Sequence, residues 1–273
     1  MTAFRRSHVL GEARAMKTSL IAAALLGAAL VLPAAPAPAA EPLTAFQKKV
    51  RAVMQMPHRS KQNRARDANR DPVKALHFCR MRDDMTVLDW APGRGWYTEI
   101  LGPLLKDKGM LYVSTQAERL KRLDALLKKE PMSKVRKLPV DVARHPVSHD
   151  ITAKELDFGL TNVDLVLNFR EYHNLDPSTR LDFNRAVLKA LKPGGHYCIV
   201  DHTRRHMEAD THENRRRVDP VLVIKEVQAA GLRFVDYAAF FLRPDDELRF
   251  EVGRRTVRGN TDRFTLLFEK PAR

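Results

Sequence analysis

The stretch Thr86-Val-Leu-Asp-Trp-Ala-Pro-Gly-Arg-Gly-Trp-Tyr-Thr98 decides the fold of this chain. Its apolar first half is typical of a buried parallel strand, which ends near Asp89. Gly93 and Gly95 then allow backbone conformations, or a close ligand approach, that a Cβ atom would obstruct. A helix is expected from about Trp96, so its free N–H groups would point at the turn. Strand, turn and helix in this order form the ligand-binding unit of open α/β sheets.

Apolar periodicity predicts that strands and helices alternate along the rest of the chain. Strands are expected at 86–89, 111–114, 135–140, 163–167, 197–200, 234–241 and 264–268, and helices at 43–53, 72–80, 96–105, 120–127, 183–191 and 221–230. The order predicts an α/β sheet that is mostly parallel, with the last two strands as an antiparallel pair. The arginine-rich stretch 58–70 has no apolar periodicity, and we interpret it as a surface connection.

The first forty residues have the pattern of a secretory signal peptide. Lys17 precedes an apolar run at 20–32, and the small residues Ala37 and Ala39 mark a cleavage site after position 39. Met16 is the expected start, because it lies just before the apolar run. We therefore expect residues 1–39 to be removed and the protein to be periplasmic or secreted. An uncleaved membrane anchor is the alternative, and no other stretch is long enough to span a bilayer.

Charge and cysteine content limit the partners and the compartment. The 273 residues include 48 Lys and Arg against 33 Asp and Glu, a formal net charge of +15. The basic clusters at 204–205 and 215–217 alternate with acidic residues and lack an aromatic stacking platform, so no nucleic-acid partner is expected. We interpret these charges as a solvated basic face that favours anionic substrates or a negatively charged envelope surface.

Cys79 and Cys198 could pair after export, but we expect two buried thiols, one on a helix and one on a strand.

Several separated motifs together resemble the class I S-adenosylmethionine (SAM)-dependent methyltransferases, and more closely a subset of predicted methyltransferases with export signals. These motifs are Pro92-Gly-Arg-Gly-Trp-Tyr-Thr-Glu-Ile-Leu101, Tyr172-His-Asn174, Leu191-Lys-Pro-Gly-Gly195, Val200-Asp-His202, Arg217-Val-Asp219 and Gly259-Asn-Thr-Asp-Arg-Phe264. The resemblance covers about 64–271. It implies a doubly wound Rossmann-like methyltransferase sheet of about seven strands, mostly parallel with an antiparallel terminal pair. The methyltransferase-like domain would cover 71–273, after a helical extension at 40–70.

The resemblance implies S-adenosyl-L-methionine as cofactor and assigns residues to it. They are Asp89, Ala91, Gly93, Gly95, Tyr97, Thr115, Gln116, Asp141 and Asn168. Two positions depart from the family. Ala91 replaces the first glycine of the usual triplet, and Thr115 replaces the acidic residue that grips the ribose hydroxyls. Neutral hydrogen bonds from Thr115 and Gln116 would be weaker than charge-assisted ones. Asp141 falls where the family often contacts the adenine amine.

The fourth expected strand leads the segment 168–174 to the carboxyl edge of the sheet, where catalytic residues are expected. His173 could act as general base, Tyr172 could orient the acceptor, and Glu171 is a second candidate base. A structural hydrogen bond that ties the loop to the next helix is the alternative role of His173. No metal is expected, since His202, His206 and His212 lack a compact ligand spacing, and no nucleophile elbow is present.

Two functions of different classes follow. The first is a SAM-dependent methyltransferase that acts on an unknown small molecule or an envelope component. The second is a non-catalytic exported ligand-binding protein on a methyltransferase fold, which Ala91 and Thr115 favour, and which the cytosolic origin of SAM also favours. A cytosolic nucleic-acid methyltransferase is a third reading, in which 1–39 is not a leader. The expected partner is a small-molecule substrate, with no membrane span after signal cleavage, and the sequence predicts no oligomeric state.

Overall fold

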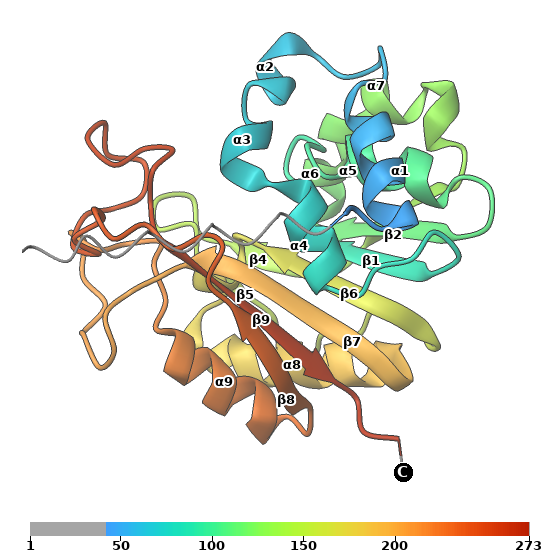
Figure 1. Cartoon of the computed structure of the whole chain (residues 1–273). Coiled ribbons are helices and arrows are strands. Elements are labelled where there is room, and N and C mark those ends of the chain that lie inside the picture. Colours follow the sequence, from blue (N-terminus) through green and yellow to red (C-terminus); the bar gives the residue numbers. More distant parts are fainter. Residues whose placement is uncertain (1–41, 273) are drawn as a thin grey trace, which may run out of the picture. The chain divides into compact units, whose positions relative to one another are not determined.

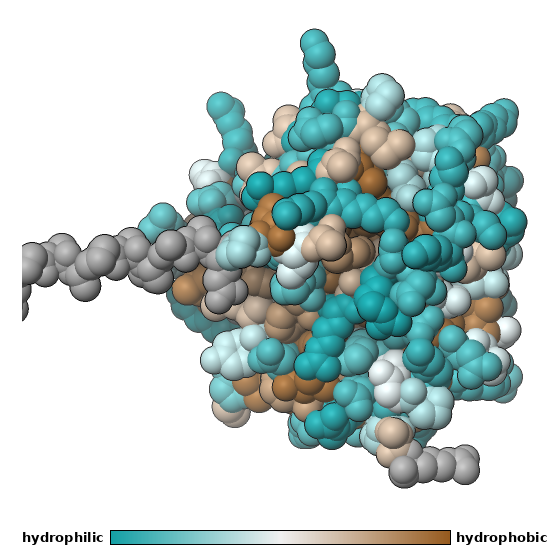
Figure 2. All heavy atoms as spheres, turned by 45° about the vertical axis from the view of Figure 1, so that its right-hand side comes forward, coloured by the Kyte–Doolittle hydropathy of each residue, from teal (hydrophilic) through white to brown (hydrophobic). Residues whose placement is uncertain are grey.

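The computed structural model describes residues 42–272, which form one compact unit (Figure 1). The predicted signal peptide lies outside the described residues. Within the described range, no helix has the length and apolar character that crossing a membrane requires. Hydrophilic residues cover most of the face in Figure 2, and hydrophobic residues form small separate areas there.

A mixed sheet of seven strands forms the centre of the unit, in the order β3-β2-β1-β6-β7-β9-β8. Its strands are β1 (Thr86–Trp90), β2 (Met110–Thr115), β3 (Val135–Pro139), β6 (Val163–Phe169), β7 (Leu191–His202), β8 (Arg233–Ala238) and β9 (Arg263–Glu269). The first five strands in this order pair in parallel, and β9 pairs antiparallel with both β7 and β8. This confirms the predicted Rossmann-like sheet with its antiparallel terminal pair. A separate two-stranded ribbon consists of β4 (Ala143–Arg144) and β5 (Ile151–Thr152).

Helices cover both faces of this sheet and give three layers (Figure 1). They are α1 (Ala45–Met54), α2 (Lys61–Arg64), α3 (Asp67–Arg70), α4 (Pro72–Phe78), α5 (Thr98–Leu105), α6 (Ala117–Leu120), α7 (Asp124–Leu127), α8 (Pro177–Ala190) and α9 (Pro220–Ala229). Neighbouring residues of a strand point to opposite faces. Val87 therefore packs with α1, α4 and α5, whereas Leu88 packs with α8 and α9. The single helix predicted at 120–127 is instead split by a 3₁₀ turn, Lys121–Leu123, between α6 and α7.

The two cysteines form a disulfide, so the prediction of two buried thiols is wrong. Cys79 directly follows α4, and Cys198 lies in β7. Helix α4 packs on the face of the sheet to which Cys198 points. The Cα atoms of the two cysteines are therefore 5.5 Å apart, within the range that a disulfide can bridge. Both residues are fully buried, as predicted, but the packing of α4 against β7 could not be read from the sequence pattern.

The segment 58–70 lies mostly at the surface, as its polarity predicted, but it is a folded part of the domain and not a simple connection. It contains α2 and α3, and polar contacts fix it to the domain. The Asn63 side chain donates to Glu99 Oε1 at 2.9 Å, and the Trp96 indole Nε1 donates to the carbonyl oxygen of Asn63 at 2.8 Å. Within the segment, the buried Arg59 side chain donates two hydrogen bonds of 2.8 Å to Asp67. Because these contacts involve charges and amides rather than an apolar stripe, the sequence shows no helical periodicity. We call residues 58–70 the cleft wall, because four of them line a cavity at the edge of the sheet.

Candidate functional site

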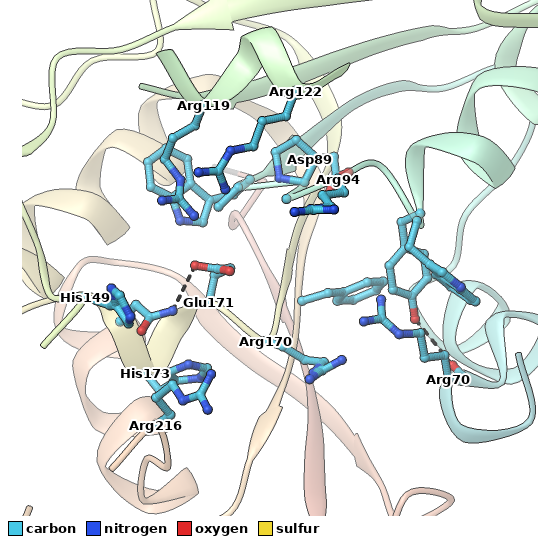
Figure 3. A pocket seen from close by; sticks show the side chains of 18 of the residues that line it. Arg70, Asp89, Arg94, Arg119, Arg122, His149, Arg170, Glu171, His173 and Arg216 are labelled. Atoms are coloured by element: carbon cyan, nitrogen blue, oxygen red, sulfur yellow. Dashed lines mark hydrogen bonds between the residues drawn. The ribbon is translucent and has the colours of Figure 1, made fainter. Parts of the chain in front are cut away.

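A cavity of about 590 Å³ opens at the carboxyl edge of the sheet. Asp89 at the end of β1, Phe169 at the end of β6 and His202 at the end of β7 line it, and the cleft wall closes one side. The sheet order reverses between β1 and β6, since β2 lies on one side of β1 and β6 on the other. Open α/β sheets bind ligands in the crevice at such a reversal. Figure 3 shows the side chains that surround the cavity.

The turn after β1 borders the cavity with two residues in the left-handed region. Ala91 has φ of 49° and Gly93 has φ of 64°. This conformation costs an alanine about 1–2 kcal/mol. The Ala91 N–H donates to the Ser114 carbonyl oxygen at 2.8 Å and helps to hold it. A Cβ on Gly93 would find no atom within 4 Å, whereas a Cβ on Gly95 would meet Leu126 Cδ2 at 2.6 Å. Gly93 therefore leaves space in the cavity, and Gly95 allows close helix packing outside it.

Asp89 is a buried carboxyl whose Oδ2 has no hydrogen-bond partner among the described residues. Burial, and then the charge of Glu171, raise the pKa of Asp89 to about 8. Asp89 therefore keeps its proton at neutral pH. A buried polar atom without a partner costs stability, so it marks a position where a ligand donor or positive charge would bind favourably.

His173 and Asp201 form a hydrogen-bonded pair between the ends of β6 and β7. His173 Nδ1 lies 2.6 Å from Asp201 Oδ1, and the His173 backbone N–H donates to Asp201 Oδ2 at 2.9 Å. A carboxylate only accepts, so Nδ1 carries the proton and Nε2 is left as the acceptor. The side chain lines the cavity, and Nε2 has no hydrogen bond to any of residues 42–272. This is the arrangement of a positioned general base.

The neighbouring His202 is arranged differently, because both of its ring nitrogens are occupied. Arg170 Nε donates to His202 Nε2 at 3.1 Å, so His202 Nδ1 carries the proton and donates to Thr261 Oγ1 at 2.8 Å. Burial, and then the charge of Arg170, lower the pKa of His202 well below its usual value. His202 is therefore neutral, and it fixes the guanidinium of Arg170.

The structure brings two further predicted residues into the cavity. Glu171 Oε2 accepts hydrogen bonds from Arg144 at 3.2 Å and from Asn174 Nδ2 at 2.9 Å. Tyr97 packs against Phe169 with ring centroids 4.6 Å apart, and burial raises the pKa of its hydroxyl to about 12. Glu171 is thus held by its neighbours, and Tyr97 contributes an apolar surface with a neutral hydroxyl.

Tyr172, which was predicted to orient an acceptor, lies outside the cavity. Its hydroxyl donates to Glu226 Oε2 at 2.8 Å and accepts from Asn184 Nδ2 at 3.0 Å. The side chain is fully buried in the core formed with α8 and α9. Tyr172 and His173 are adjacent in a 3₁₀ turn, so their side chains leave the backbone in different directions. Only His173 reaches the cavity.

Four other residues that the resemblance assigned to the cofactor do not line the cavity. Thr115 is buried at the end of β2, and Gln116 Nε2 donates to a backbone carbonyl oxygen 2.6 Å away. Asn168 Nδ2 donates to the Tyr197 hydroxyl at 3.1 Å, and Asp141 is exposed. Neither Thr115 nor Gln116, which were predicted to bind the ribose, lines the described cavity.

The sequence reasoning missed the feature that dominates this cavity, which is arginine. Eight arginine side chains line it, against the two carboxyl groups of Asp89 and Glu171: they are Arg66, Arg70, Arg94, Arg119, Arg122, Arg144, Arg170 and Arg216. The density of arginine in 58–70 was a visible signal, but the others come from loops that only the fold brings together. Within residues 42–272, no group of three His, Cys, Asp or Glu side chains is placed to hold a metal ion.

No family model matches this chain, and no curated protein matches it. Solved structures do resemble it. A SAM-dependent methyltransferase from Aquifex aeolicus has 20% identity and a TM-score of 0.53, over 82% of this chain and 98% of that one. The [4+2]-cyclase SpnF has 14% identity and a TM-score of 0.54, over 76% and 82%. Human N-acetylserotonin methyltransferase in complex with SAM has 10% identity and a TM-score of 0.50, over 84% and 57%. The chain therefore has the fold of the SAM-dependent methyltransferases, and a cyclase has this fold too.

Proposed function

We propose that this protein is a SAM-dependent methyltransferase that acts on a small molecule or an envelope component. The observation that carries the proposal is the shared cavity of the glycine turn, the buried carboxyl of Asp89 and the His173–Asp201 pair. A cofactor-binding turn and a positioned base at one sheet edge are what methyl transfer to a protonated acceptor needs. The solved structures support the proposal through the fold.

The chemistry of the cavity can be tested against the cofactor. SAM carries a positive sulfonium, an amino group and a carboxylate. The unpartnered Oδ2 of Asp89 fits the amino group, which can donate a hydrogen bond to it, and the space beside Gly93 fits a ligand that approaches the backbone. The arginine side chains fit the carboxylate. When bound there, SAM would supply an electrophilic methyl group.

The residues of the chain would handle the acceptor proton. His173 Nε2 can accept the proton of an acceptor hydroxyl or amine, and Asp201 then stabilises the imidazolium through the bond to Nδ1. The Asp201 side chain is fully buried and also accepts from the His202 backbone N–H at 2.7 Å, so the pair is rigidly held.

Titration calorimetry of the purified protein with SAM, and with its demethylated product, tests this proposal. Gly93→Asp would fill the open space at the turn, so micromolar binding should be lost in that variant. Gly159→Asp is the matched control, because Gly159 has φ of 62° and an equally open Cβ position but does not line the cavity. Binding that survives Gly93→Asp, or no binding up to millimolar SAM, would contradict the proposal.

A non-catalytic binding protein on the same fold is the second candidate. The burial of Thr115, and its absence from the cavity lining, favour this candidate, because nothing at the end of β2 replaces the usual acidic ribose contact. The cyclase with this fold also indicates that the architecture is not restricted to methyl transfer. Failure of the SAM titration together with binding of another ligand would establish this candidate.

We also propose that the chain is exported and cleaved after Ala39, so that the mature protein is periplasmic or secreted. The disulfide between Cys79 and Cys198 supports this proposal, because such bonds persist in oxidising compartments. Cell fractionation and N-terminal sequencing of the mature protein test it. A cytosolic protein that begins at Met1 or Met16 would contradict the proposal of export. It would instead favour the third hypothesis, a cytosolic nucleic-acid methyltransferase.

A further inference from the structure

The cavity at the sheet edge continues into a second one of about 750 Å³. The two share lining residues from the cleft wall, from the ends of β6 and β7 and from the 216–252 region: Gln62, Arg66, Arg70, Arg170, His202, Arg216 and Val252. The second cavity adds Arg258 and Arg263, so ten arginine side chains line the combined space. We call this space the cationic cleft. Figure 3 shows Arg119 and Arg122 on one side of its first cavity and Arg70 on the other.

Most of these guanidinium groups lack a carboxylate partner. Arg144 pairs with Glu171 at 3.2 Å, and Arg216 pairs with Glu251. For the other eight, no Asp or Glu oxygen of residues 42–272 lies within 4.0 Å. Charged side chains away from bulk water are normally paired. Of these eight, the three that are largely buried, Arg70, Arg170 and Arg263, depart from this rule.

Three of the unpaired groups are held in place by neutral contacts. Arg263 is 6% exposed, its terminal nitrogen donates to a backbone carbonyl oxygen of Asn69 at 2.6 Å, and its Nε has no partner among the described residues. Arg70 lies 4.7 Å above the Trp96 ring, and Arg170 is fixed by His202. Their positions are thus set before any ligand binds, which lowers the entropy cost of binding.

These fixed charges oppose one another. Burial, and then the charge of Arg170, lower the pKa of Arg70 to about 9. The same two causes lower the pKa of Arg263 to about 10, and burial followed by the charge of Arg66 lowers that of Arg170. Arginine side chains keep their charge at neutral pH, so the folded protein contains unrelieved repulsion among these three groups. An anion between them would relieve it and gain charge-assisted hydrogen bonds.

We propose that the cationic cleft binds a small molecule with at least two anionic groups, phosphate or carboxylate, placed among Arg66, Arg70, Arg170, Arg258 and Arg263. Guanidinium forks match both groups in geometry. A nucleic-acid strand fits less well, because Trp96 is buried beside Arg59 and Arg70 and offers no free face for a base. Under the proposed function on which this role rests, the anion is the methyl acceptor, whose reacting group lies at His173.

Calorimetry with two probes, inorganic pyrophosphate and citrate, tests the proposal on the whole protein. At least one probe should bind with a micromolar dissociation constant that weakens with added salt. Arg66→Gln and Arg258→Gln should each weaken binding about tenfold, since each removes one charged contact. Both residues are exposed, so these variants should fold. The better probe identifies the anionic group as phosphate or carboxylate.

Arg255→Gln is the matched control. Arg255 is exposed, lies three residues before Arg258 and does not line either cavity. The proposal is overturned if neither probe binds at millimolar concentration, or if Arg255→Gln weakens binding as much as Arg258→Gln does. Its failure is distinguishable from failure of the methyltransferase proposal. Anion binding without SAM binding would refute only the proposal of methyltransferase activity. SAM binding without anion binding would refute only the proposal that the cationic cleft binds an anionic small molecule.

Discussion

The imidazole of His173 and the carboxylate of Asp201 meet at 2.6 Å, although His173 follows β6 and Asp201 lies near the end of β7. The parallel pairing of β6 with β7 produces this approach, because it brings both carboxyl ends to one edge of the sheet. Asp201 accepts three hydrogen bonds, from His173 Nδ1, from the His173 backbone and from the His202 backbone. The pair therefore fixes the direction in which Nε2 faces the cavity.

Replacing Asp201 with asparagine should damage this pair. One oxygen becomes an amide donor that faces an N–H, so at least one bond is lost and the free energy of unfolding should fall by about 1–3 kcal/mol. Methyl transfer to an acceptor that must lose a proton should slow by about 10²- to 10⁴-fold. Denaturant unfolding and the rate of demethylated product formation measure the two effects. Unchanged turnover would show that His173 is a structural residue, and SAM affinity in the same variant should stay as it is.

The raised pKa of Asp89 predicts a pH dependence of stability. The folded protein holds this proton up to about pH 8, whereas the unfolded chain releases it near the usual value of 3.8. The stability contributed by protonated Asp89 is therefore complete below about pH 4 and is lost as the pH rises through about 8. Asp89→Asn removes the titration, so the variant should gain stability over the wild type across this window. Parallel stability profiles from pH 4 to 8 would contradict the prediction.

The disulfide should account for a large part of the stability. It joins residues 119 positions apart, so it removes many conformations from the unfolded chain. Cys79→Ala with Cys198→Ala should lower the free energy of unfolding by about 2–4 kcal/mol. Denaturation with and without dithiothreitol measures this. Reductant should destabilise the wild type and leave the double variant unchanged, and an equal response of both would refute the bond.

A second stabilising contact is the ion pair of Arg217 with Asp246. Both side chains are at most 1% exposed, and two hydrogen bonds of 2.8 and 3.0 Å join them. Asp246→Ala leaves a buried unpaired guanidinium and should cost about 3–5 kcal/mol. Asp182→Ala removes an exposed ion pair with Arg185 and should cost less than about 1 kcal/mol. Similar losses in the two variants, measured by urea unfolding, would contradict this account.

The sheet could be predicted because its buried strands have apolar sequences that are visible without the structure. The apolar runs at 163–167 and 197–200 identified β6 and β7, and the glycine turn located β1. The positions of Asp89 and His173 at the cavity followed from the rule that parallel strands present their carboxyl ends together. Local pattern and topology were enough for these features.

Features that depend on the packing of distant segments could not be predicted. The Cys79–Cys198 bond requires α4 over β7, and the direction of Tyr172 depends on a 3₁₀ turn. The cleft wall is held by hydrogen bonds and ion pairs, which produce no periodic signal in the sequence. The arginine residues of the cleft also lie in polar stretches without periodicity, so the sequence analysis interpreted them as an ordinary basic surface.

The polar attachment of the cleft wall has a consequence for access to the site. Its helices α2 and α3 bury no residue, and polar contacts attach it to the domain, among them those of Arg59 with Glu99 and of Trp96 with Asn63. Opening the wall exposes no apolar helix face, whereas opening β1 would expose the apolar core. Backbone amides of 61–70 should therefore exchange with deuterium long before those of β1. A ligand can enter by transient release of this wall, so the segment before the sheet would control how fast the cavity exchanges its contents.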